Sequence, residues 1–282
     1  MIKSFSLPYP CVKDETLLQE IADAGFTGID LAFFPAGGHY PKDGLLRRDA
    51  LEKNMDTFRD KMAKYGLVCN QVHFPVYDIF ASSEMMDEEV EACITNTLHA
   101  MAYLGVKWGA FHPMSSTNFA YDRKRAMHDN RERLKKHLET AEKLGVGIAV
   151  ENIPVFPDCP QYQFFTSVVE DHMELVDSLY SDKIGICWDF GHANLMPYDK
   201  AQVLDMMGSR VKILHIHSNY EQRDLHICPG LGTVNWDTLM PILKKHGFSG
   251  DITLEVELGG VPCRKEYLAY CGAVAEKLCA MF

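Results

Sequence analysis

The chain has 282 residues, 47% hydrophobic and 24% charged, a composition that is typical of a globular protein and excludes a disordered or fibrous one. Its 28 basic and 39 acidic residues give a net charge of −11, which disfavours nucleic-acid partners because such a surface repels phosphate backbones. The odd number of cysteines, nine without a CxxC pair, and the lack of an apolar leader or spanning segment predict a cytoplasmic protein without disulfides or membrane contact.

Apolar runs alternate with amphipathic helical stretches along the whole chain. Several of these runs are continuously apolar, as expected for strands that are covered on both faces. In chain order, the sequence predicts strands at 2–7, 28–33, 67–73, 107–112, 147–151, 184–189, 211–217 and 251–257. Between and after them it predicts helices at 13–24, 50–65, 88–104, 122–144, 165–180, 235–245 and 264–281. The charge run within 122–144 is most simply the solvated face of its helix.

A glycine followed by an apolar residue marks the end of five predicted helices. Glycine just past a helix end adopts the left-handed conformation at little cost, so we expect each one to close its helix and lead into the next strand. These glycines are Gly25, Gly66, Gly105, Gly145 and Gly247.

Eight strands alternating with helices predict an α/β fold, a (β/α)8 TIM barrel made by a single domain of residues 1–282. The alternative is an open, doubly wound sheet. No GxGxxG motif follows the first strand, which weakens the dinucleotide-binding form of that alternative.

Six of the predicted strands end, or nearly end, in a side chain that can bind a metal. A TIM barrel carries its chemistry at the C-terminal ends of its strands, so these side chains are expected on one rim. They are His73 in VCNQVH, His112 in WGAFH, Glu151 in GIAVE, Asp189 in GICWD, His215 and His217 in VKILHIH, and Glu255 and Glu257 in DITLEVE.

Four consecutive strands contribute Glu151, Asp189, one histidine of 211–217, and Glu255. Neighbouring strands lie roughly 5 Å apart, so these side chains can converge. One acid at a strand end is more often a helix cap or an ion-pair partner, but four ligand-type residues on one rim favour a metal site. Carboxylates and imidazoles suit Mn, Co, Mg or Zn, and more than one ion is possible.

Two local motifs add further ligand-type residues. In Asp189-Phe190-Gly191-His192, the histidine follows the aspartate by three residues, in what we expect to be a loop. Asp224-Leu225-His226 precedes the turn PGLG, whose glycines allow the backbone to approach a ligand closely.

With these motifs in this order, the chain resembles the xylose-isomerase-like TIM barrels, a superfamily of sugar phosphate isomerases and epimerases. Its members include ketose 3-epimerases, inosose dehydratases and endonuclease IV. The resemblance covers nearly the whole chain and rests on VEN at 150–152, WDFGH at 188–192, HIH at 215–217, the D-x-H…PG-x-G…W segment at 224–236 and LEVE at 254–257.

For the sugar enzymes, the resemblance implies one divalent metal on Glu151, Asp189, Glu255 and either His215 or His217, with His192 touching the substrate. Both strand histidines face inward because side chains alternate along a strand. The family pattern favours His215 as the ligand. His217 would then contact substrate or be a hydrogen-bonded barrel histidine.

The three-zinc endonuclease offers a longer match. The residues that match the endonuclease include those of the single-metal site and further ones from other strands and loops. The typical ketose epimerase has an arginine where His226 stands in this chain. We therefore predict six residues as substrate-binding residues or additional metal ligands: His73, His112, His192, His217, Asp224 and His226.

The resemblance and the rim ligands together predict a metal-dependent isomerase or epimerase that acts on a sugar or polyol-like ketose through an enediolate, with Glu151 and Glu255 as the proton-transfer groups. One alternative is a lyase or dehydratase that acts by the same enolisation on an inosose-like or oxidised glycoside substrate. The other is an abasic-site phosphodiesterase with three zinc ions. A non-enzymatic binding domain on a decayed barrel fits poorly with six intact rim ligands. We expect a small carbohydrate partner, with homo-oligomers possible.

Overall fold

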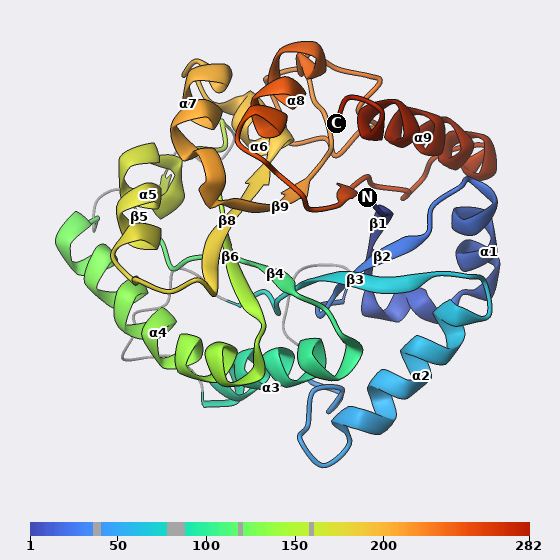
Figure 1. The fold of residues 1–282 in the computed structure, drawn as a ribbon, viewed down its shortest axis with the longest axis horizontal. Coiled ribbons are helices and arrows are strands. Elements are labelled where there is room, and N and C mark those ends of the chain that lie inside the picture. Colours follow the sequence, from blue (N-terminus) through green and yellow to red (C-terminus); the bar gives the residue numbers. More distant parts are fainter. Residues whose placement is uncertain (36–40, 78–87, 118–120, 158–160) are drawn as a thin grey trace.

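Eight parallel strands form a barrel at the centre of the computed structural model, which describes residues 1–35, 41–77, 88–117, 121–157 and 161–282 (Figure 1). Around the barrel the strand order is β10-β1-β2-β3-β4-β6-β8-β9. The circle is completed where Ile216 N donates to Thr253 O at 2.9 Å and Glu255 N donates to Ile216 O at 3.1 Å. The strands are β1 Lys3–Pro8, β2 Gly28–Ala32, β3 Val68–His73, β4 Trp108–Phe111, β6 Gly147–Glu151, β8 Ile184–Asp189, β9 Val211–His215 and β10 Ile252–Leu254.

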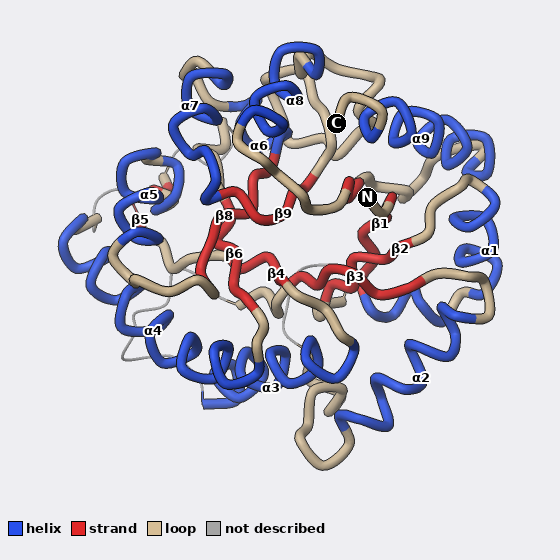
Figure 2. Tube along the Cα trace, viewed as in Figure 1, coloured by secondary structure: helices blue, strands red, loops and turns tan. Residues whose placement is uncertain are grey.

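Helices surround the barrel, as Figure 2 shows in blue around the red strands. They are α1 Glu15–Asp23, α2 Leu51–Ala63, α3 Glu88–Leu104, α4 Arg123–Leu144, α5 Val169–Asp177, α6 Phe190–Leu195, α7 Lys200–Met207, α8 Trp236–Lys245 and α9 Arg264–Cys279. A small antiparallel pair joins β5 Ser116–Thr117 to β7 Tyr162–Gln163. Among the described residues, no helix combines the length and apolar character needed to cross a bilayer. The predicted single-domain TIM barrel is confirmed.

The two faces of each strand carry different side chains. On β6, Ile148 and Val150 belong to the large apolar core shared with the helices, whereas Ala149 faces the barrel interior. Ala149 packs there with Ala110, Cys187 and Ile213 in a small apolar cluster. The next inward-facing position on β6 is Glu151, so the alternation that builds the core also directs this carboxylate to the rim.

The five predicted helix-closing glycines are confirmed, since each has a φ between 70° and 86°. At Gly145, the C-cap of α4, the following Val146 N donates back to Ala141 O at 3.0 Å. This geometry ends the helix and turns the chain directly into β6.

Two helices were not predicted, and one predicted loop is helical. Residues 190–192 begin α6, for which Asp189 is the N-cap, and α7 follows after a short break. Both helices are too short to show a full apolar period, which is why the sequence did not reveal them. The predicted helix at 165–180 is a 3-10 turn at Phe165–Ser167 followed by α5.

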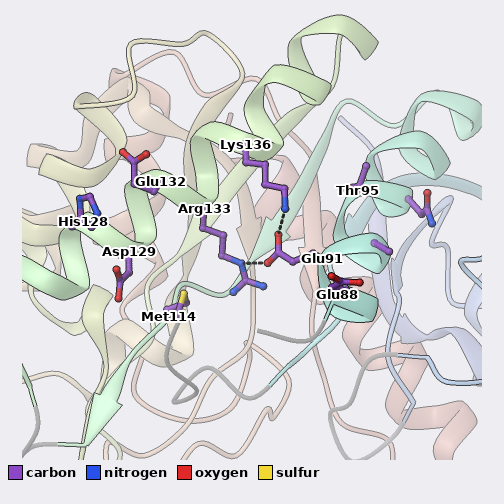
Figure 3. A pocket seen from close by; sticks show the side chains of 11 residues that line it. Glu88, Glu91, Thr95, Met114, His128, Asp129, Glu132, Arg133 and Lys136 are labelled. Atoms are coloured by element: carbon purple, nitrogen blue, oxygen red, sulfur yellow. Dashed lines mark hydrogen bonds and ion pairs between the residues drawn. The ribbon is translucent and has the colours of Figure 1, made fainter. Parts of the chain in front are cut away.

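The charged face predicted for α4 is partly buried, which corrects the sequence interpretation. Arg133 and His137 are 7% and 1% exposed. Arg133 Nε lies 2.9 Å from Glu91 of α3 (Figure 3), and His137 Nε2 lies 3.0 Å from the same carboxylate. The Arg133 guanidinium also lies 4.1 Å from the ring centre of Tyr77. These contacts bind α3 to α4 through a charge network. A cavity of about 770 Å³ beside it is lined by none of the predicted site residues.

The Glu91 network predicts a pH-dependent contribution to stability. Burial alone would raise the pKa of Glu91, but the hydrogen bond with His137 and the charge of Arg133 lower it from 4.5 to about 2. Because the pKa is lower in the folded protein, the carboxylate stabilises the fold above about pH 4.5, and this contribution is lost as the pH falls towards 2. Glu91→Gln should therefore lower the thermal midpoint at pH 7 and reduce its fall between pH 6 and pH 3.

The matched control is Glu139→Gln, which makes the same charge change at an exposed position of α4. Its thermal midpoints should follow those of the wild-type protein at every pH. Identical pH profiles for the wild-type and Glu91→Gln proteins would contradict this account of the network.

Candidate metal centre

The predicted ligand-type residues lie together at the C-terminal rim of the barrel. His73, Glu151, Asp189 and His215 are the last residues of β3, β6, β8 and β9. Two further residues follow the ends of their strands: His112 after β4 and Glu255 after β10.

A first group consists of Glu151, Asp189, His215 and Glu255, whose ligand atoms all lie within 4.8 Å of one another. The Nδ1 atom of His215 is 3.3 Å from Glu151 Oε2 and 3.4 Å from Glu255 Oε2. Glu151, Asp189 and His215 are almost fully buried, whereas 20% of the Glu255 side chain is exposed. Glu255 is therefore the member that faces the open side of the rim.

The electrostatics of this group suit a cation. Burial alone would raise the pKa of Glu151, but the charges of His215 and His112 hold that pKa well below its ordinary value. Glu151 Oε2 and His215 Nδ1 are buried without a hydrogen-bond partner. Unpaired buried polar atoms are costly, and a divalent cation bound between a carboxylate oxygen and an imidazole nitrogen would satisfy both. The residues present therefore fit a divalent metal.

A second group shares Glu151 with the first and adds His73 and His112. Glu151 Oε2 lies 3.3 Å from His112 Nε2 and 3.5 Å from His73 Nε2. The two imidazole Nε2 atoms are 3.2 Å apart. These histidines thus approach the carboxylate of Glu151 from β3 and β4.

A third group contains His192, His217, Asp224 and His226. Asp224 Oδ2 lies 3.3 Å from His192 Nε2 and 3.0 Å from His226 Nε2. The rings of His217 and His226 stack with their centres 3.8 Å apart. His217 Nε2 also lies 3.0 Å from Asp189 Oδ1, so Asp189 joins this group to the first.

The two histidines of the HIH motif therefore have different surroundings. His215 lies among Glu151, Asp189 and Glu255, whereas His217 lies with His192, Asp224 and His226. This places the histidine favoured by the family pattern beside the three acids. Its role as a metal ligand stays a prediction.

Backbone contacts hold the VEN and DFGH motifs together. The side chain of Asn152 accepts from Asp189 N at 2.7 Å and donates to Asp189 O at 2.9 Å. Asp189 Oδ1 in turn accepts from His192 N at 2.7 Å as the N-cap of α6. A Cβ atom at Gly191 would overlap the His217 ring, so the glycine allows α6 to approach the segment that follows β9 closely.

One residue of the site, Asp30 in the middle of β2, escaped the sequence interpretation. It is fully buried and its Oδ2 lies 3.4 Å from His215 Nε2. The signal was available, because an acid inside the apolar run GIDLA is unusual. Asp30 lies inside its strand, whereas the predicted ligands lie at the ends of theirs.

Residues 18–268 match the sequence profile of the xylose isomerase-like TIM barrel family. The chain belongs to this family. The match spans every strand of the barrel except β1 and confirms the resemblance inferred from the motifs.

Several proteins show the range of relatives. An uncharacterised protein of Methanocaldococcus jannaschii is 28% identical over 194 residues, which are 65% of this chain and 63% of that protein. The inosose isomerase of Halalkalibacterium halodurans is 28% identical over 129 residues, 42% of each chain. These matches thus span less than two thirds of either relative. Among solved structures, a D-tagatose 3-epimerase-like protein superimposes with a TM-score of 0.76 at 22% identity, covering 99% of this chain and 97% of that one.

Proposed function

We propose that this protein is a divalent-metal-dependent isomerase or epimerase that acts on a ketose or a polyol-derived ketone. One observation carries the proposal: Glu151 at the end of β6 and Glu255 just after β10 bring carboxylate oxygens to 3.3 and 3.4 Å from the same nitrogen of His215, with Asp189 beside them. The names of two similar proteins, an inosose isomerase and a D-tagatose 3-epimerase-like protein, support this substrate class.

Glu151, Asp189, His215 and Glu255 would hold the metal. When bound, a divalent cation supplies Lewis-acid stabilisation of the negative charge that develops on a ketone oxygen as the neighbouring carbon loses a proton. Manganese is our first candidate among Mn, Co, Mg and Zn.

The two glutamates would transfer the proton. Glu151 stays ionised at neutral pH, because its histidine neighbours outweigh the effect of burial and keep its pKa low. One carboxylate takes a proton from the carbon beside the carbonyl. The other, once protonated, returns a proton to that carbon in epimerisation or to the next carbon in isomerisation. The exposure of Glu255 gives it access to solvent for proton exchange.

The third group would bind substrate oxygens. His192 and His226 both place Nε2 on Asp224 Oδ2, which holds this carboxylate in place. Asp224 Oδ1 is buried without a hydrogen-bond partner and can accept a hydrogen bond from a substrate hydroxyl group. The net charge of −11 favours a neutral sugar over a phosphorylated polymer.

The proposal predicts solvent exchange at carbon. The Mn2+-loaded protein, incubated in D2O with D-tagatose, D-psicose or an inosose, should incorporate deuterium beside the carbonyl of at least one of them. Glu151→Gln should reduce that incorporation by about 100-fold or more, since it removes a proton-transfer group and a ligand. NMR of the recovered sugar measures the exchange, and circular dichroism confirms that the fold survives.

Asp171→Asn is the matched control, because Asp171 is also a buried acid but pairs with Arg123 on the helical shell. This control should exchange like the wild-type protein. Undiminished exchange in Glu151→Gln would show that Glu151 is not a proton-transfer group. Exchange accompanied by a product lighter by one water would identify a lyase that shares the first step.

A second candidate, an abasic-site phosphodiesterase with three zinc ions, is favoured by one observation. The three groups form a continuous set joined through Glu151 and Asp189, and His226 stands in it where ketose epimerases have an arginine. The discriminating assay is cleavage of an abasic-site duplex oligonucleotide by the Zn2+-loaded protein, with zinc counted by mass spectrometry. The isomerase proposal predicts no cleavage. Cleavage with about three zinc ions per chain would contradict the isomerase proposal and support the phosphodiesterase.

A further inference from the structure

Asp30 occupies an unusual position for a charged residue. It lies in the middle of β2, with both oxygens buried and neither in a hydrogen bond. A register shift between Ile29 and Asp30 pairs Asp30 with Gln71 and skips Asn70 on β3. This bulge sets the alignment of β2 against β3 below His73, since such irregularities redirect side chains.

A buried carboxylate without hydrogen bonds is expensive, so the residue it faces is informative. Asp30 Oδ2 lies 3.4 Å from His215 Nε2, and both side chains are fully buried. His73 and His226 differ from His215 in this respect. Each places Nδ1 on a main-chain carbonyl: that of Phe74 at 2.8 Å for His73, and that of Glu255 at 3.0 Å for His226.

The two nitrogens of His215 face opposite surroundings. Nδ1 faces the carboxylates of Glu151 and Glu255, whereas Nε2 faces Asp30. A neutral imidazole carries one proton, and the nitrogen without it offers the lone pair that binds a metal. A carboxylate beside Nε2 favours the proton there and frees Nδ1 for the cation.

We propose that Asp30 is a positioning residue for the metal centre: it accepts the Nε2 proton of His215, which fixes the ring orientation and the tautomer that presents Nδ1 to the metal. This inference rests on the metal site of the proposed function, but not on the reaction. The negative charge of Asp30 increases the basicity of Nδ1 and offsets the positive charge that the ring gains when it binds a cation.

The test is the affinity for Mn2+, measured by calorimetry on metal-free protein, in a graded series at Asp30. Asp30→Asn keeps an oxygen that can accept from Nε2 but removes the charge, and Asp30→Ala removes both. We expect Asp30→Ala to weaken Mn2+ binding by about 10- to 100-fold, with Asp30→Asn between it and the wild-type protein. Asp171→Asn, a buried acid on the helical shell, should bind Mn2+ like the wild-type protein.

A second measurement needs no variant at Asp30. In protein with 15N-labelled histidine and bound Zn2+, the His215 ring, assigned with a His215→Gln variant, should carry its proton on Nε2.

Three results would overturn the inference: wild-type affinity in folded Asp30→Ala, an equal loss in Asp171→Asn, or a proton on Nδ1 of His215. A wild-type protein that binds neither Mn2+ nor Zn2+ would instead remove the metal site itself. That outcome is distinct from a failure of Asp30 alone.

Discussion

The burial of the Glu151 carboxylate among histidines is the interaction on which the rest of the site depends. This side chain is 1% exposed and lies within 3.5 Å of ring nitrogens of four histidines, His73, His112, His192 and His215. A carboxylate in such a position must be compensated by positive charge, from imidazolium rings or from a bound cation. The fold supplies the imidazoles from β3, the segment just after β4, α6 and β9, so the barrel as a whole creates the centre.

The barrel interior below the rim is asymmetric, and this asymmetry explains how the centre is supported. On one side, small residues of β4, β6 and β8 fill the space, with Ala110, Ala149 and Cys187 in contact. On the other side the interior is polar: Thr253 Oγ1 donates to Gln71 Oε1 at 3.1 Å, and Asp30 lies on the neighbouring strand. Asp30, on the polar side, lies 3.4 Å from His215 Nε2, so its buried charge can act on the ring.

Most of the fold was predictable because two independent signals agree along the chain. Glycines such as Gly145 end helices, and apolar runs such as 147–151 follow them, so strand order and rim position could be read together. Asp189 and Glu255 were found in this way. Asp30 was not, because it lies inside β2 and not at the end of the strand. The burial of Arg133 was missed because it depends on Glu91 and Tyr77, which belong to other parts of the chain. The short helix α6 begins at Asp189 as its N-cap, a role that a metal-ligand pattern does not indicate.

The central claim is that Glu151, Asp189, His215 and Glu255 together bind a divalent metal. Anomalous diffraction from crystals of the Mn2+-loaded protein, recorded on both sides of the manganese absorption edge, tests it most directly. We expect a manganese peak bounded by these four side chains, with His215 contributing Nδ1. A map with no peak among them, or with peaks only beside Asp224 and His226, would contradict it.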